Sequence, residues 1–469
     1  MKASCAINWI PSALLWAAAV SLSGSGCGSG NGAAADATTG QPNPGPDSAA
    51  GTGGTTTVPA GTDSGASGGG GPATGGAGGG QNGDSGSGGA MQPASGNLTV
   101  SAGTLARDHT IVTFSLPGSA GKTLALRDAQ GATLPLQVDM DGVATFVLPS
   151  LAAGQDAHYA IVDPASPPSP IITTTPEANG VRIKNGDSDL LRFQTVGQLP
   201  AGAGQQYLRG GYIYPFYTPS GGIPTDDYPP SHPHQHGIWD AWLSATFAGH
   251  TINFWDFTGG ARGKVDFQAL DGMWQGPVHG GVRARLAHID LSGGQGVTAL
   301  NEQWMITAYH THDGAAPYFV FDLTSTQEAA TAQPFVVNQT TYSGFGVRGA
   351  RPWVGGGGVT YLSSEGLARG PGDNTPSRWT YLGGMVNGKV VGSVMMGHPQ
   401  NFRAPQKVRF NPTEPYWAFA PMRDGSFTIA TGQPLNSRFR VLTFDGPPDR
   451  ALIDRLWSDF ATPPAVHVE

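Results

Sequence analysis

Short runs of alternating or β-branched residues recur along the chain from about residue 97 onward. Gly, Asp and Pro separate these runs at intervals of about 10 residues, which is typical of a small β-sandwich. A Pro-rich stretch from Pro164 to Pro170 then indicates a stiff connector between two domains. We therefore predict a small β-sandwich domain over residues 97–170. Its expected strands are Asn97–Val100, Thr110–Leu116, Thr123–Arg127, Leu134–Val138, Ala144–Val147 and His158–Val162.

Residues 171–469 continue this pattern and are enough for one large antiparallel β-sandwich with a full core. Only Pro448–Thr462 has a helical pattern, because Leu452, Leu456 and Phe460 recur at every fourth position. Strands and helices do not alternate, which argues against a dinucleotide-binding fold. The predicted fold class is therefore all-β, with a small N-terminal β-sandwich, a large β-sandwich and one C-terminal helix. The strands expected in the large sandwich are Gly180–Lys184, Leu190–Thr195, Tyr207–Tyr214, Val282–Asp290, Val297–Tyr309, Tyr318–Thr326, Pro334–Gln339, Lys389–Met396, Arg409–Phe410, Phe427–Thr431 and Ser437–Phe444.

The N-terminus has the pattern of an export signal. Lys2 precedes a short apolar run, Ile7–Leu22, and about 16 residues suit a signal peptide better than a bilayer span. Small residues then lead to Cys27, so we expect a lipoprotein signal peptide over residues 1–27 with Cys27 as the lipidated residue. Gly24 stands where such sites usually carry Leu, and simple secretion with an unmodified Cys27 is the alternative.

Residues 28–96 contain no aromatic residue and no Lys or Arg, and they are rich in Gly, Ser, Ala and Thr. Such a segment buries too little apolar surface to offset the entropy of ordering it, so we predict a disordered tether. A tether after a lipidated residue would hold the folded part clear of a membrane. The expected location is outside the cytoplasm, as an outer-membrane or cell-surface lipoprotein, or otherwise as a periplasmic or secreted protein.

The charge balance and the cysteine content limit the classes of partner that the chain can bind. The chain has 25 basic and 33 acidic residues, a formal charge of −8, which argues against a general affinity for nucleic acid. Its two cysteines both lie in the first 27 residues, which excludes a disulfide framework and a Cys-based zinc site in the rest of the chain. We expect no nucleic-acid partner and membrane contact through the lipid anchor only.

The segment Tyr212–Phe257 has the greatest density of reactive and aromatic residues. Prolines favour extended geometry around His232, His234 and His236, and alternate residues of an extended chain point to one face. One interpretation is a divalent-metal site of these three histidines, completed by Asp240 or left open. A second is acid–base chemistry beside a carboxylate, with a sugar ring against the aromatics. A third is a Pro-rich loop with purely structural histidines. The neighbouring residues that would shape a pocket are Asp226, Asp227, Tyr228, Trp239 and Trp242.

Four residues outside this segment are further candidates. Glu302 is a lone acid on an otherwise apolar strand, and a buried acid usually needs a partner. Arg348 would clamp an anion or pair with Glu302, or it is structural. His398 and Asn401 lie in a Pro-bounded turn after an apolar strand, where a structural role is the alternative to ligand binding.

Several motifs resemble those of the bacterial PmoA-type family, often labelled "methane oxygenase PmoA". They are Tyr214–Gly221, Asp227–His234, Gly237–Trp239 and Asn253–Trp255, with softer matches at Gly344–Arg348 and Gly397–Asn401. The resemblance covers about residues 97–445 and implies a galactose-mutarotase-like supersandwich in a polysaccharide-utilisation setting. Many members read His-His-Arg where this chain has His234-Gln235-His236. The oxygenase label fits poorly, because a particulate methane oxygenase subunit needs several membrane spans.

These observations lead to one leading hypothesis and two alternatives. The leading one is an exported, lipid-anchored protein acting on a carbohydrate or carbohydrate-derived ligand as a lyase, hydrolase or epimerase. Its catalytic candidates are His234 and His236 with Glu302 or Asp240. The alternatives are a non-catalytic glycan-binding protein and a metal-dependent enzyme built on His232, His234 and His236. The candidate ligand-binding residues are His232, Asp227, Tyr228, Trp239, Trp242, Trp255, Arg348, His398 and Asn401.

Overall fold

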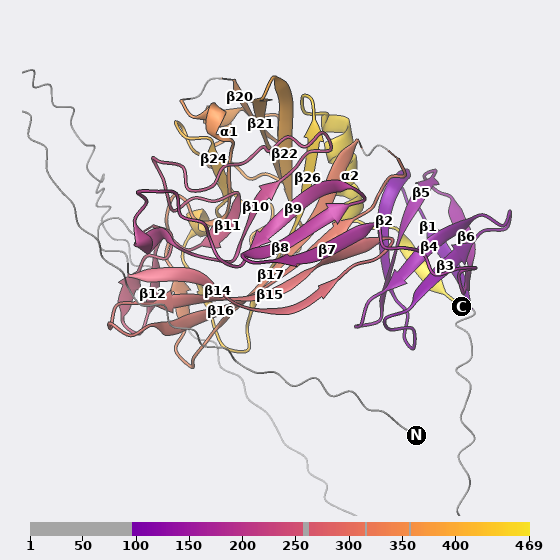
Figure 1. Cartoon of the computed structure of the whole chain (residues 1–469), viewed down its shortest axis with the longest axis horizontal. Helices are drawn as coiled ribbons and strands as arrows, with labels where there is room; N and C mark the ends of the chain where they lie inside the picture. The colour runs from indigo at the N-terminus through magenta and orange to yellow at the C-terminus, as the bar shows by residue number, and fades with distance from the viewer. Residues whose placement is uncertain (1–95, 257–261, 315–316, 356–357) are drawn as a thin grey trace, which may run out of the picture. The chain divides into compact units, whose positions relative to one another are not determined.

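A computed structural model describes residues 96–256, 262–314, 317–355 and 358–469 (Figure 1). The chain divides after Gly86 into two units, and all described residues lie in the second unit. The expected signal peptide, lipidation at Cys27 and tether up to residue 95 lie outside the described residues. No helix in the described ranges combines the length and apolarity that crossing a bilayer requires.

The predicted all-β fold class is confirmed. The described residues form four antiparallel sheets, with a 12-residue helix, α2 (Arg450–Ala461), near the C-terminus. The side chain of Asp449 caps α2 by accepting hydrogen bonds from the N–H groups of Ala451 and Leu452. The helix lies within the range expected from its apolar spacing. A four-residue helix, α1 (Arg369–Gly372), was not expected.

The first sheet, here the N-terminal sheet, has the strand order β2-β5-β4-β3-β6-β1-β27. Its last strand comes from the opposite end of the chain, because Val468 pairs with Leu98 and Ala465 with Ser101. This strand was not expected from the sequence. The bounds are β1 (Gly96–Ser101), β2 (Arg107–Ser115), β3 (Thr123–Arg127), β4 (Thr133–Val138), β5 (Val143–Leu151), β6 (Asp156–Val162) and β27 (Ala465–Val468).

Two eight-stranded sheets make up most of the remaining chain. The first large sheet has the order β23-β24-β19-β11-β10-β9-β8-β7. Its strands are β7 (Ile172–Glu177), β8 (Gly180–Asn185), β9 (Ser188–Gln194), β10 (Tyr212–Phe216), β11 (Ile238–Ala241), β19 (Gly344–Arg348), β23 (Val408–Phe410) and β24 (Tyr416–Phe419).

The second large sheet has the order β14-β15-β16-β17-β26-β22-β21-β20. Its strands are β14 (Gly263–Trp274), β15 (His279–Asp290), β16 (Val297–Tyr309), β17 (Tyr318–Ala329), β20 (Val359–Ser363), β21 (Trp379–Val386), β22 (Lys389–Gly397) and β26 (Leu435–Asp445). A four-stranded sheet, β13-β12-β18-β25, completes the set. It consists of β12 (Ala245–Phe247), β13 (His250–Ile252), β18 (Phe335–Val337) and β25 (Phe427–Ile429).

The two large sheets pack face to face around one apolar core. Phe345 on β19 lies 5.6 Å from Trp304 on β16 and 4.6 Å from Phe439 on β26, measured between ring centroids. All three side chains are buried. Because side chains alternate along a strand, Trp239, next to the inward-facing partner of Phe345 on β11, points to the outer face of the first large sheet. That outer face carries the Pro- and His-rich segment.

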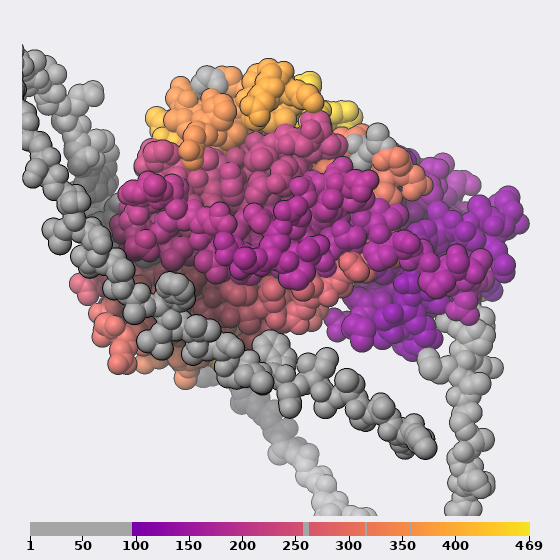
Figure 2. Space-filling model, viewed as in Figure 1, coloured from indigo at the N-terminus to yellow at the C-terminus, as the bar shows by residue number. Residues whose placement is uncertain are grey.

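The N-terminal sheet packs against the second large sheet and α2, and Figure 2 shows its indigo and purple atoms in contact with the larger body. Arg107 on β2 donates to Asp459 on α2 over 2.9 Å, and Thr110 donates to the other carboxylate oxygen over 2.9 Å. Ile111 on β2 belongs to the same apolar cluster as Leu456 of α2. A buried ion pair and an apolar contact therefore join the N-terminal sheet to α2.

We expect Asp459→Ala to lower the free energy of unfolding by about 3–5 kcal/mol, because it leaves the Arg107 guanidinium buried without its counter-charge. Urea titration of the full chain measures this loss. The control is Asp449→Ala, which removes only the helix cap and should cost about 1 kcal/mol. Equal losses for the two variants would contradict a structural role for the buried ion pair.

Candidate functional site

The segment between β10 and β11 crosses the outer face of the first large sheet as an irregular loop, because its prolines cannot donate ladder hydrogen bonds. Trp239 on β11 and Gly346 on β19 are register partners on that face. A Cβ at Gly346 would lie 3.0 Å from the Tyr416 ring and 3.2 Å from the Trp239 ring. The glycine therefore leaves space for these two rings, whose centroids are 5.6 Å apart, to form a buried aromatic floor under the loop.

A pocket of about 320 Å³, here the histidine pocket, opens above this floor. His234 and Trp255 lie in its wall with ring centroids 6.4 Å apart, and His232 lies 5.7 Å from His234. The structure thus brings three of the predicted site residues into one pocket. The full lining is Tyr207, Ser231, His232, Pro233, His234, Gln235, Trp255, Asp256, Tyr342, Asn411 and Tyr416.

His234 is uncharged at neutral pH. Burial lowers its pKa to about 3, and the neighbouring Asp256 carboxylate only partly opposes this effect. Burial also lowers the pKa of His232. A neutral imidazole donates one hydrogen bond and accepts another, which suits hydroxyl groups. The low pKa also makes His234 a weak general base at neutral pH in the unliganded chain.

His236 does not line the histidine pocket. It is fully buried, its Nδ1 lies 2.5 Å from an Asp227 carboxylate oxygen, and its ring stacks on Tyr212 at 4.1 Å. The Tyr212 hydroxyl donates to the other Asp227 oxygen over 3.0 Å. Burial lowers the pKa of His236 and raises that of Asp227, so it favours the uncharged form of each partner. This contact holds the loop against the sheet.

A metal site built on His232, His234 and His236 finds no support in the geometry. Across the described ranges, no group of three or more His, Cys, Asp or Glu side chains is placed to hold a metal ion. At this place His236 is fully buried and does not line the pocket that His232 and His234 line, so the three imidazoles do not converge.

Glu302 lies on the opposite side of the first large sheet, between the two large sheets. Its carboxylate accepts hydrogen bonds from His288 Nε2 at 2.9 Å, the Trp304 indole at 2.6 Å and the Ser325 hydroxyl at 2.7 Å. Burial opposes ionisation of Glu302, but the hydrogen bond from His288 and those from other side chains outweigh it and lower the pKa. Both carboxylate oxygens of Glu302 therefore accept hydrogen bonds, which favours its charged form.

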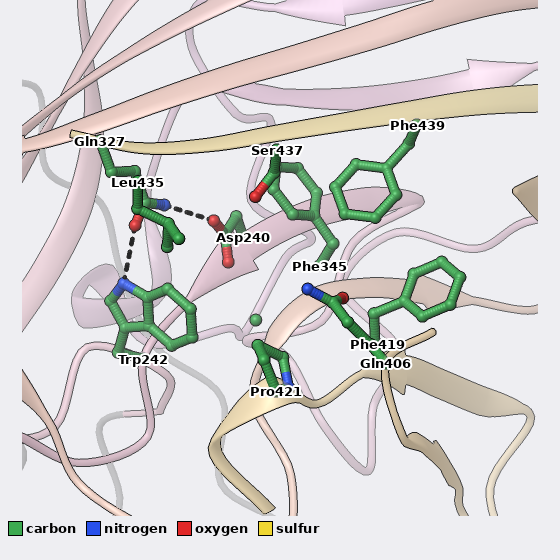
Figure 3. Close-up of a pocket in the computed structure, with 11 residues that line it drawn as sticks. Asp240, Trp242, Gln327, Phe345, Gln406, Phe419, Pro421, Leu435, Ser437 and Phe439 are labelled. Carbon is green, nitrogen blue, oxygen red and sulfur yellow. Dashed lines mark hydrogen bonds between the residues drawn. The ribbon is translucent and has the colours of Figure 1, made fainter. Parts of the chain in front are cut away.

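Asp240 and Trp242 belong to the same network. The Gln327 amide donates to Asp240 over 2.5 Å, and its oxygen accepts from the Trp242 indole over 3.0 Å (Figure 3). The same amide donates to Glu302 over 3.1 Å. Burial and the nearby charge of Glu302 raise the pKa of Asp240 well above its usual value, which favours the uncharged acid.

The cavity beside Asp240 has a volume of only about 10 Å³, which is room for about one water molecule. No sugar ring fits there. Asp240, Glu302 and Trp242 therefore do not share a ligand pocket with His234, contrary to the grouping expected from the sequence. The physical reason is the alternation of β11, which points Trp239 outward and Asp240 inward.

Arg348 and Trp239 support the histidine pocket from below. The Arg348 guanidinium donates to Gln235 over 2.8 Å and to Glu414 over 2.7 Å, so its acidic partner is Glu414 and not Glu302. Trp239 is fully buried and lies 5.1 Å from Trp255. Neither residue lines the pocket.

Asp227 and Tyr228 line a neighbouring polar pocket of about 310 Å³, together with Asp226 and Arg351. Arg351 forms an ion pair with Asp226 at 2.9 Å. The backbone of Tyr228 has a positive φ of 47°, a conformation that is costly for a bulky residue and is often retained at binding sites.

His398 and Asn401 lie elsewhere, beside β26. The Asn401 amide donates to the carbonyl of Arg438 over 2.9 Å, and its oxygen accepts from the Arg438 N–H over 2.8 Å. Asn401 therefore fixes the turn to the strand. His398 borders a separate, larger cleft.

Sequence reasoning missed several residues of the histidine pocket. Asp256 directly follows the Asn253–Trp255 motif, so its place in the sequence could have identified it as a candidate. Tyr342, Asn411 and Tyr416 come from distant parts of the chain and reach the pocket only because β19 pairs with both β11 and β24. No local pattern marks them.

The low pKa of His234 makes the stability of the folded chain pH-dependent. Below pH 6.5 the unfolded chain binds a proton at this residue that the folded chain does not bind until about pH 3. The free energy of unfolding should therefore decrease as the pH is lowered below 6.5, by up to about 1.4 kcal/mol per pH unit for this residue. Urea unfolding of His234→Asn between pH 6 and 4.5 should show a slope shallower by that amount. The exposed His158→Asn is the control, and an unchanged slope for His234→Asn would contradict the burial argument.

The comparison with known protein families gives one match, and no curated protein matches the chain. The model of the "Family of unknown function (DUF6807)" matches residues 180–458. This range is more than half of the chain and includes every residue of the histidine pocket. The chain belongs to the family of unknown function DUF6807.

Proposed function

We propose that the protein binds a carbohydrate or carbohydrate-derived ligand in the histidine pocket. The observation that carries this proposal is the combination of three aromatic side chains, Trp255, Tyr342 and Tyr416, with the uncharged imidazole of His234 in one pocket. Aromatic rings pack against the apolar face of a sugar, while neutral polar groups bind its hydroxyls. A volume of about 320 Å³ suits a small sugar unit.

Acid–base chemistry on the bound sugar is the second candidate function. Of the catalytic residues expected from the sequence, only His234 lines the pocket, and the Asp256 carboxylate lines it as well. This pairing favours proton transfer by His234 with Asp256 in place of Glu302 or Asp240. A lyase, hydrolase or epimerase reaction would use such a pair. Because His234 is a weak base before a ligand binds, the geometry supports binding better than catalysis.

The proposed location follows from the N-terminus. A signal peptide ending at Cys27 and a flexible tether would place the histidine pocket outside the cytoplasm on a lipid anchor. The resemblance to the PmoA-type family supports the same setting, because it implies polysaccharide utilisation. Membrane contact through the anchor alone also agrees with the formal charge of −8, which disfavours binding to anionic lipid.

We expect Tyr342→Ala to weaken binding of the sugar by about tenfold, which corresponds to about 1.4 kcal/mol. Tyr342 is half-buried, so its truncation removes contact area without opening the core. The ligand is first found by a thermal-shift screen of sugars, uronic acids and keto-sugars, and its affinity is measured by calorimetry. The control is Tyr217→Ala, a half-buried tyrosine outside the pocket. No shift with any sugar, or equal affinity of both variants, would refute the proposal.

The variants His234→Gln and Asp256→Asn separate binding from catalysis. If the pocket is catalytic, both should retain binding within a few-fold and lose turnover of the identified sugar by at least about 100-fold. Turnover that survives both substitutions would leave the protein as a binding protein and exclude the second candidate function.

A further inference from the structure

A second and larger cavity, of about 870 Å³, lies between the N-terminal sheet and the outer face of the second large sheet. We call it the interdomain cleft. One wall is the β4–β5 hairpin, and the other consists of β14 to β17 and β26, with the end of α2 at one side. It shares no lining residue with the histidine pocket. Its volume is near the upper end of the range for ligand sites.

The walls of the cleft are fixed to one another. Gln137 on β4 donates to the carbonyl of His279 over 2.9 Å, and its side-chain oxygen accepts from the N–H groups of Val278 and His279, both at 3.1 Å. Gln137 is buried. Together with the buried ion pair between Arg107 and Asp459, these bonds hold the cleft open in the absence of ligand, so binding requires little reorganisation.

An aromatic platform lies in the cleft wall. Trp274 on β14 is the register partner of Gly281 on β15, and a Cβ at Gly281 would lie only 2.5 Å from the indole ring. The ring therefore covers the backbone of Gly281. Its Nε1–H donates to His279 Nδ1 over 2.9 Å, which fixes its orientation. Trp274 is half-buried and lines the cleft.

Exposed apolar side chains gather at the same cleft. Met140 is 81 % exposed, Met273 42 % and Val143 38 %, and all three belong to its lining. Clustered exposed apolar side chains mark interaction sites, and the flexible thioether of methionine adapts to irregular partners. A ligand for this cleft therefore has apolar faces.

Four carboxylates of the lining are already paired with arginines, although Arg107 and Arg285 lie outside the lining. Ion pairs join Asp322 to Arg440, Asp141 to Arg283, Asp271 to Arg285 and Asp459 to Arg107. Asp139 accepts backbone hydrogen bonds instead. Arg438 of the lining donates to Gln400. A charged ligand would have to compete with these contacts, whereas an uncharged ligand would not.

The remaining polar lining consists mainly of hydroxyl and amide groups. Its members are Thr113, Thr123, Gln137, Thr145, Gln275, Thr307 and Thr324. Such groups both donate and accept hydrogen bonds without carrying charge. An uncharged polyhydroxy ligand with apolar faces matches the platform, the exposed side chains and this lining together.

We propose that the interdomain cleft binds a stretch of uncharged oligosaccharide, several sugar units long, against the Trp274 platform. This site is separate from the histidine pocket and does not depend on its ligand. The protein would then hold a glycan chain at one place and a small sugar unit at another.

Affinity electrophoresis of the full chain tests the proposal. The gels contain one of three neutral polysaccharides: xylan, galactomannan or mixed-linkage β-glucan. Gels with polygalacturonate test for a charged ligand, and gels with a gelatin hydrolysate test for a peptide ligand. At least one neutral polysaccharide should retard the chain, and Trp274→Ala should weaken this binding by about tenfold. Retardation by polygalacturonate or peptide alone, or no retardation, would overturn the proposal.

Two further variants keep the result interpretable if Trp274→Ala unfolds. Met140→Ala truncates a side chain that is 81 % exposed at the cleft and should weaken binding several-fold, while Met385→Ala, 48 % exposed on β21, should not. Tyr342→Ala should leave the retardation unchanged, which separates this site from the histidine pocket. Equal retardation of the Met140 and Met385 variants, or loss of retardation in the Tyr342 variant, would refute the assignment to the cleft.

Discussion

The alternation of side chains along β11 is the constraint on which the arrangement of this protein depends. Trp239 and Asp240 are neighbours in sequence, yet Trp239 lies under the histidine pocket and Asp240 joins a carboxylate network between the two large sheets. A shift of one residue in the pairing of β11 with β19 would exchange these two environments. It would place a carboxyl group under the aromatic pocket and an indole in the polar network. The register of one short strand therefore keeps the apolar floor and the buried charge apart.

The buried network costs desolvation energy, and its hydrogen bonds offset part of that cost. Glu302 receives hydrogen bonds from His288, Trp304, Ser325 and Gln327, and the raised pKa of Asp240 favours an uncharged acid beside it. An uncharged Asp240 lowers the penalty of placing two acids between apolar sheets. The donors come from β15, β16 and β17, so the network ties three strands to β11. It positions the sheet that carries the histidine pocket without touching the pocket.

Local pattern was sufficient for the fold class and insufficient for the site. The first six strands follow from alternation, and α2 follows from its apolar spacing. Strands β11, β19 and β24 are short and rich in Gly and aromatic residues, so their pairing depends on tertiary packing that no window of sequence contains. The histidines and Trp255 were recognisable because they are close in sequence. Tyr342 and Tyr416 meet them only through β19 and β24, and the separation of Glu302 from His234 depends on which face of each strand they occupy.

The histidine pocket and the interdomain cleft lie on outer faces of the two large sheets. The outer face of an antiparallel sheet is normally polar and solvated. Here a Pro-rich loop covers one outer face and the N-terminal sheet covers the other. Each cover removes aromatic and polar groups from water, and burial at the first face is strong enough to keep His234 neutral. At the loop-covered face the cover extends the apolar cluster, which includes Tyr228, Trp239 and Trp255. The covers also produce preformed concave surfaces with mixed apolar and polar lining, and the recognition of uncharged ligands is what we propose for both faces.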